Sequence, residues 1–204
     1  MSSHPRPSKA EVVSDFRRAQ ILDAARESFG RQGLAGTTVD GIARRAGVAK
    51  GTVYLYYKSK EEIFKQVLDD DLRALHENTV PVITAPGSIE EKIHRFLVGA
   101  LTFFDQRRDF FEQCMFEMGA EVRKKAVQKF EVVFTAQVDG WRLALTEAQH
   151  AGLIGPIDIG AAALMIVALS SGLAKQRLRG WVAGPIDAVA IEASRTLWKG
   201  LATR

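Results

Sequence analysis

Apolar residues in this chain recur every three or four positions, in runs that glycine and proline separate. Ile21, Leu22, Ala25 and Phe29, for example, mark one face of a helix that is expected over 18–33. No segment alternates polar and apolar residues as a half-buried strand does, and no internal repeat is visible. The chain is therefore predicted to be all-α.

Two short helices are expected directly after the first helix. Thr37 or Thr38 can cap a helix that ends before Gly47, and a third helix should begin near Lys50 and end at Tyr56 or Tyr57. Two helices joined by a short turn that contains glycine form a helix-turn-helix unit, whose second helix enters the DNA major groove. The side chains expected to face the inside of this unit are Val39, Ile42, Ala43, Val48 and Val53.

The rest of the chain predicts further helices. Ser59 with Glu62, and Ser88 with Glu91, have the spacing of capping boxes, and Pro81 is expected to end the helix that Ser59 begins. The expected helices cover 59–80, 88–104, 110–118, 122–151, 157–179 and 186–201, with Gly152 and Gly155-Pro156 closing the long fourth of these. We predict three parts: a flexible N-terminal arm (1–16), a helix-turn-helix DNA-binding domain (17–62), and a larger helical domain for ligand binding and dimerisation (63–204).

Charge is distributed unevenly along the chain. Residues 1–60 contain eleven Lys or Arg against five Asp or Glu, whereas the remainder contains seventeen against nineteen, within a net charge of +4. A basic N-terminal part fits a surface that faces phosphates. Charge alone fits an ordinary solvated surface equally well.

Cys114 is the single cysteine, so no intramolecular disulfide is possible, and no residue spacing typical of a metal site occurs. No cofactor or metal is expected. The first ten residues lack the apolar stretch of a secretory signal, and the apolar run 159–169 is shorter than the ~18 residues that suggest a membrane span. A cytoplasmic protein with no membrane partner is therefore expected.

Residues 37–62 read TTVDGIARRAGVAKGTVYLYYKSKEE. This segment resembles the DNA-binding signature of the tetracycline-repressor (TetR) family, through the threonine before the second helix, the Ala-Gly-Val turn and the Gly-Thr-Val-Tyr and Tyr-Lys-Ser-Lys-Glu runs. The resemblance covers about a quarter of the chain, and the remainder is similar only in length and helical pattern. The DNA-contacting residues that the resemblance implies are Thr38, Lys50, Gly51, Thr52, Tyr54, Leu55, Tyr56 and Lys60.

The chemistry of these residues agrees with such contacts. Thr38 at a helix N-terminus can hold a phosphate, and Gly51 permits close approach of the backbone to DNA. Lys50 can reach a phosphate or guanine, and Leu55 departs from the more polar residue that is common in the family. Tyr57 is expected in the core. The alternative is a small helical subdomain that never meets DNA.

For the larger domain the resemblance implies a homodimer through the last two helices, where small residues permit close helix approach. It also implies an apolar pocket for a small-molecule effector, to which we assign His94, Phe104, Phe111, Met115, Gln137 and Trp141. Simple core packing is the alternative for each of these residues.

The predicted function is sequence-specific regulation of transcription by a repressor that a small-molecule effector releases from a palindromic, double-stranded DNA operator. An enzyme is not expected, since the histidines are widely spaced and no catalytic signature or phosphate-binding loop occurs. Activation of transcription, or DNA binding without an effector, stays open.

Overall fold

The computed structural model of this chain describes residues 8–114 and 120–201. These residues form helices without a β-strand, as predicted. The helices are α1 (Lys9–Gly36), α2 (Val39–Arg45), α3 (Lys50–Tyr56), α4 (Lys60–Thr84), α5 (Ile89–Gln106), α6 (Arg108–Glu112), α7 (Ala120–His150), α8 (Ile159–Leu178) and α9 (Ile186–Leu201).

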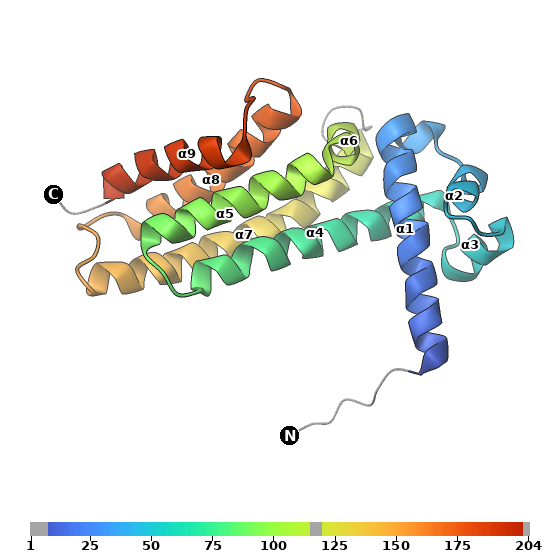
Figure 1. Ribbon diagram of the computed structural model, residues 1–204, viewed down its shortest axis with the longest axis horizontal. Coiled ribbons are helices and arrows are strands. Elements are labelled where there is room, and N and C mark those ends of the chain that lie inside the picture. The colour runs from blue at the N-terminus through green and yellow to red at the C-terminus, as the bar shows by residue number, and fades with distance from the viewer. Residues whose placement is uncertain (1–7, 115–119, 202–204) are drawn as a thin grey trace.

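The helices divide the molecule into a small end and a larger body (Figure 1). Helices α1, α2 and α3 lie together at one end, and α4 runs from them into the body, where it packs against α5 and α7. Helix α5 also contacts α8 and α9, while the short α6 packs against α1. Both α4 and α6 therefore connect the small end to the body.

Three of the predicted N-caps form. The side chains of Thr38, Ser59 and Ser88 accept hydrogen bonds from the backbone three residues ahead, as N-caps do. Ser88 and Glu91 make both bonds of a capping box, as predicted. Ser59 makes only one, because the Glu62 carboxylate accepts instead from the backbone N–H of Lys58.

Two predicted boundaries were wrong. The first helix begins at Lys9 rather than near residue 18, because Ser8 and Glu11 form a capping box that supports two further turns, so 9–16 is not a flexible arm. Pro81 does not end α4, which continues to Thr84. Pro81 cannot donate to the carbonyl of Glu77 one turn earlier, but its own carbonyl still accepts from the Ala85 N–H, so the last turn of α4 is closed.

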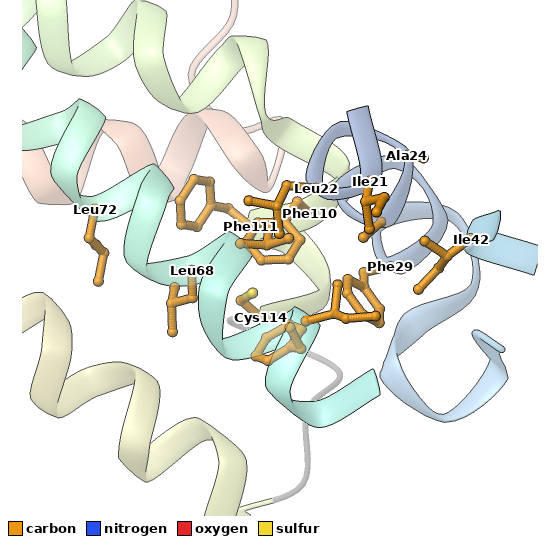
Figure 2. Packing of buried hydrophobic residues seen from close by; sticks show 14 of the residues in the cluster. Ile21, Leu22, Ala24, Phe29, Ile42, Leu68, Leu72, Phe110, Phe111 and Cys114 are labelled. Carbon is orange, nitrogen blue, oxygen red and sulfur yellow. The ribbon is translucent and has the colours of Figure 1, made fainter. Parts of the chain in front are cut away.

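A hydrophobic cluster joins the small end to the body (Figure 2). Ile21 and Phe29 of α1 pack in it with Leu68 of α4, and the same cluster includes Phe110 and Phe111 of α6. A second cluster, around Phe96 and Trp141, fills the far half of the body. The first cluster contains residues from both sides of the predicted boundary at residue 62. Because these residues are closely packed, a displacement of α4 or α6 would also displace α1.

Helix α8 is longer and more apolar than the run 159–169 suggested. By length and composition it could cross a bilayer, and about a third of its apolar stretch is buried inside the protein. Core helices of soluble proteins pass the same test, and α8 packs against α5 and α7. This is weak support for a membrane span.

Candidate nucleic-acid interface and ligand cavity

Gly47 makes the turn between α2 and α3. Its φ of 65° lies in the left-handed region, and a Cβ there would meet nothing within 4 Å, so backbone conformation rather than packing favours glycine. The Val48 N–H then donates to the Ala43 carbonyl at 3.0 Å and closes the end of α2.

The inner side of the helix-turn-helix unit is packed as predicted. Ile42 and Ala43 of α2 and Val53 of α3 are buried, and Val39 and Val48 are half-buried against the same cluster. Because Val53 points into the core, the rotation of α3 about its own axis is fixed. The residues on the opposite side of α3 therefore face outward.

The outer side of α3 carries the predicted contact residues. Lys50, Gly51, Tyr54 and Leu55 are exposed, and Thr52 is half-buried. Leu55 is 82% exposed, which is unusual for a large apolar side chain, and a Cβ on Gly51 would meet nothing within 4 Å. Nothing in the packing of the described residues requires this pattern, so it can serve an external partner.

Lys50 is held by α2. Its Nζ lies 2.9 Å from a carboxylate oxygen of Asp40, and this hydrogen bond and the Asp40 charge raise the pKa of Lys50. Both side chains are about half exposed, so the pair can open when a phosphate or a base competes for the ammonium group.

Lys60 has a role inside the protein that the sequence did not predict. Its Nζ donates to the carbonyls of Leu34, Ala35 and Thr37, which engages all three N–H groups of the ammonium. Lys60 thus caps the end of α1, and its contact with DNA stays a prediction. Thr38 is exposed, with its oxygen accepting from the Gly41 N–H at 3.1 Å.

The three tyrosines have different surroundings. Tyr54 is exposed, and Tyr57 is buried as predicted, which raises the pKa of its phenol to about 12. The ring of Tyr56 is half-buried, with the Arg18 guanidinium 5.6 Å from its centroid. Sequence reasoning missed Arg18 because the two residues lie far apart in the chain.

A cavity of about 610 Å³ lies between α4, α5, α7 and α8. Two of the residues predicted for an effector pocket, Phe104 and Gln137, line it. The Nε2 of Gln137 donates to the Thr79 hydroxyl at 2.8 Å, and that hydroxyl donates to the Leu75 carbonyl. Cys114 also lines the cavity, and burial together with the Asp71 charge raises the pKa of its thiol.

The other predicted pocket residues do not line this cavity. His94 lies at a separate surface pocket between α5 and α9. Phe111 and Trp141 are fully buried in the two hydrophobic clusters, where helical spacing alone could not separate core from pocket. Met115 lies outside the described residues. Within 8–114 and 120–201, no group of three or more His, Cys, Asp or Glu could hold a metal ion.

A buried carboxylate links the small end to the body. Asp71 of α4 is 1% exposed and accepts from Arg26 of α1 at 2.9 and 3.0 Å and from Arg107, between α5 and α6, at 3.1 Å. Burial alone would lower the pKa of Arg26, but its bonds with Asp71 and Asp23 raise it above the ordinary value. Two arginines therefore neutralise one buried charge, from opposite sides of the junction.

The next residue, Arg108, bonds to the opposite side of the body. Its guanidinium donates to the carbonyls of Arg177 and Leu178 at the end of α8, and to Asp105 at 3.1 Å. Burial alone would raise the pKa of Asp105, but Arg177 and Arg108 hold it below the ordinary range. The α5–α6 junction is thus tied to α4 and α1 by Arg107 and to α8 by Arg108.

Residues 21–67 match the family described as "Bacterial regulatory proteins, tetR family". A curated relative, the uncharacterised HTH-type transcriptional regulator YhgD of Bacillus subtilis, is 32% identical over 117 residues, which cover 57% of this chain and 60% of YhgD. The HTH-type transcriptional repressor SCO4008 of Streptomyces coelicolor is 38% identical over 80 residues, covering 39% of this chain and 40% of that protein. The chain thus spans less than two thirds of these relatives in sequence.

The fold is similar over a longer stretch. The structure of the fatty acid degradation regulator FadR from Bacillus halodurans superimposes with a TM-score of 0.70 over 89% of this chain and 94% of that one, at 19% identity. The matched proteins are regulators rather than enzymes, in agreement with the prediction.

Proposed function

We propose that this chain is a sequence-specific transcriptional repressor that a small-molecule effector releases from a palindromic operator, because residues 21–67 match the tetR family of bacterial regulatory proteins and a relative over part of the chain is named a repressor. DNA binding implies a cytoplasmic location. The observation that carries the proposal is the outer side of α3, where Lys50, Gly51 and Leu55 are exposed opposite the buried Val53.

Each proposed contact with DNA follows from the chemistry of a side chain and from its position on α2 or α3. Lys50 leaves Asp40 for a phosphate or the O6 and N7 atoms of guanine, and Leu55 contacts a thymine methyl group. Gly51 permits the α3 backbone to approach the groove. Thr52, Tyr54 and Tyr56 contribute hydroxyl groups, and Thr38 binds a phosphate from the start of α2.

The operator is two-fold symmetric because the protein acts as a homodimer. The first half of α8 has an exposed face of Ala161, Leu164, Met165 and Ala168, with Leu164 49% and Met165 55% exposed. Ile191 of α9 is also exposed, and both helices lie against α5. A face of small and apolar residues suits close packing of helices from two subunits, and it explains the apolar character of α8 without a membrane.

The effector occupies the 610 Å³ cavity and acts on α4. Leu75 of α4 lines the cavity, and Asp71, one turn earlier, carries the bonds to Arg26 and Arg107. An effector that favours a shifted α4 would move α1 with it and change the separation of the two α3 helices.

Selection of bound sequences from random duplex DNA at physiological salt tests this function. We expect the full chain to enrich a two-fold symmetric motif, with half-sites about one helical turn, or a multiple of it, apart. Lys50→Ala and Thr52→Ala should lose or relax the motif, and Arg142→Ala, at an exposed basic residue on α7, should keep it. A folded dimer that enriches no sequence would overturn the proposal.

A further inference from the structure

Helix α1 carries apolar side chains on two opposite sides. Its buried residues all lie between Ile21 and Phe29, in the part of the helix that packs within the first hydrophobic cluster. Phe16 precedes the fully buried Ala25 by nine residues, or about two and a half turns, so the two side chains point to opposite sides of the helix. The N-terminal turns of α1 therefore direct their large apolar side chains away from the domain.

This outward side of α1 is open to solvent. Val12, Val13 and Phe16 are each more than half exposed, and no residue of 9–20 is buried. Figure 1 shows this part of α1 extending beyond α2 and α3, on the side of the molecule away from α8 and α9. Packing among the described residues gives no reason for apolar side chains at these positions, whereas a further protein surface does.

Charged residues continue the same side of the helix. Lys9 lies seven residues before Phe16 and Asp23 seven residues after it, about two turns in each direction, so the three share one face. Lys9 is exposed and Asp23 is 72% exposed, with Arg26 bonded to one of its two carboxylate oxygens. Glu27, one turn further, is also exposed, so this side would repel the phosphates of DNA or of a membrane.

We propose that this face of α1, from Lys9 to Asp23 with Phe16 at its centre, pairs antiparallel with the same face of a second copy of the chain. Two-fold pairing about Phe16 sets Lys9 of each copy against the partner's Asp23 and covers the apolar side chains of both. A parallel pair would set Lys9 against Lys9 and Asp23 against Asp23. Charge therefore selects the antiparallel arrangement.

The pairing is separate from the proposed homodimer contact, because this face lies on the side of the molecule away from α8 and α9 (Figure 1). It would join one dimer to a second dimer, a step that rests on the homodimer of the proposed function. A face of about four turns buries less than the ~1,200 Å² of a stable interface, so the pairing is weak and reversible. A covalent trap is therefore the suitable measurement.

Disulfide trapping in the full chain tests the pairing. Under mild oxidation at micromolar concentration, we expect Phe16→Cys to link two chains at least about tenfold faster than Glu27→Cys. Glu27 is the matched control, since it is exposed on the same face but would lie about 33 Å from the partner's Glu27 in the antiparallel pair. The wild-type chain reports any contribution of the buried Cys114. Equal rates for the two variants would overturn the proposal.

Exchange of the two charges tests the register. In the Phe16→Cys chain, Lys9→Glu should slow trapping at least about fivefold, because both ion pairs are replaced by like charges. Addition of Asp23→Lys should restore the rate, since it exchanges the two charges within each pair. A rate that the second substitution leaves low would contradict the register.

The mass of the trapped species tests the link between dimers. Light scattering should give four chains or more, at least about 90 kDa for a chain of 22.5 kDa, and a species of only two chains would overturn this step. The proposed function is tested separately, because reduced Phe16→Cys should enrich the same DNA motif as the wild-type chain. If trapping fails while the motif is kept, the inference fails and the proposed function stands.

Discussion

At Gly51, a substitution that should not lower protein stability is expected to weaken DNA binding. Alanine has the higher helix propensity, and a Cβ at Gly51 meets no atom of the protein within 4 Å. Gly51→Ala should therefore leave stability unchanged or raise it by up to about 1 kcal/mol. The added methyl group would stand between α3 and the groove, so affinity for the operator should fall about tenfold.

Thermal unfolding and fluorescence anisotropy of labelled operator check both halves of this expectation. Gly200→Ala is the matched control, since Gly200 is also an exposed glycine of a helix with nothing within 4 Å of a Cβ. It should affect stability similarly and operator affinity not at all. Full operator affinity in Gly51→Ala would show that α3 does not approach DNA at this residue.

Cys114 should react slowly although it lines the cavity. Burial and the Asp71 charge raise the pKa of its thiol, and thiol reagents attack the thiolate. At pH 8 we expect labelling of the native protein to be at least about a hundredfold slower than in denaturant. Equal rates in the two conditions would mean that the thiol is neither buried nor perturbed, and a role in redox sensing would have to be reconsidered.

At the scale of elements, α4 and the α5–α6 junction connect the cavity with the DNA-binding end. Asp71→Asn removes the charge that Arg26 and Arg107 share, while the shape of the side chain is kept. Loss of one partner of a fully buried pair costs about 3–5 kcal/mol. Because Arg26 and Arg107 retain roughly a fifth of their exposure, we expect about 2 kcal/mol of lost stability in urea unfolding.

Asp23→Asn is the control for this change, because Asp23 binds the same Arg26 guanidinium but is 72% exposed. It should cost less than about 0.5 kcal/mol. Equal effects of the two variants would show that the buried carboxylate does not hold α1 to the body.

The sequence predicted those parts of the fold and site that depend on neighbours along the chain. The turn at Gly47 and the outward face of α3 follow from local spacing and from the backbone freedom of glycine. The capping of α1 by Lys60 and the bonds of Asp71 join residues 23 to 45 positions apart, so no periodicity reveals them. The same reason explains why Phe111 and Trp141 could not be told from pocket residues.

At the scale of the whole molecule, the account requires two copies of the chain. Glutamate at both Leu164 and Met165 would place charges on the exposed face of α8 and should yield a monomer of 22.5 kDa. The wild-type chain should have twice that mass. Val132→Glu on α7 replaces a residue that is 72% exposed and should stay dimeric. Light scattering coupled to gel filtration gives these masses, and a monomeric wild type would refute the proposed interface.

The most direct test of the central claim measures how the spacing of half-sites affects affinity. Five base pairs inserted between the half-sites of the selected operator rotate one half by about half a turn relative to the other. If one dimer reads both half-sites with its two α3 helices, affinity should fall to that of a duplex with a single half-site. Unchanged affinity after the insertion would contradict the claim, because it would mean that the chain binds DNA without two-fold reading by α3.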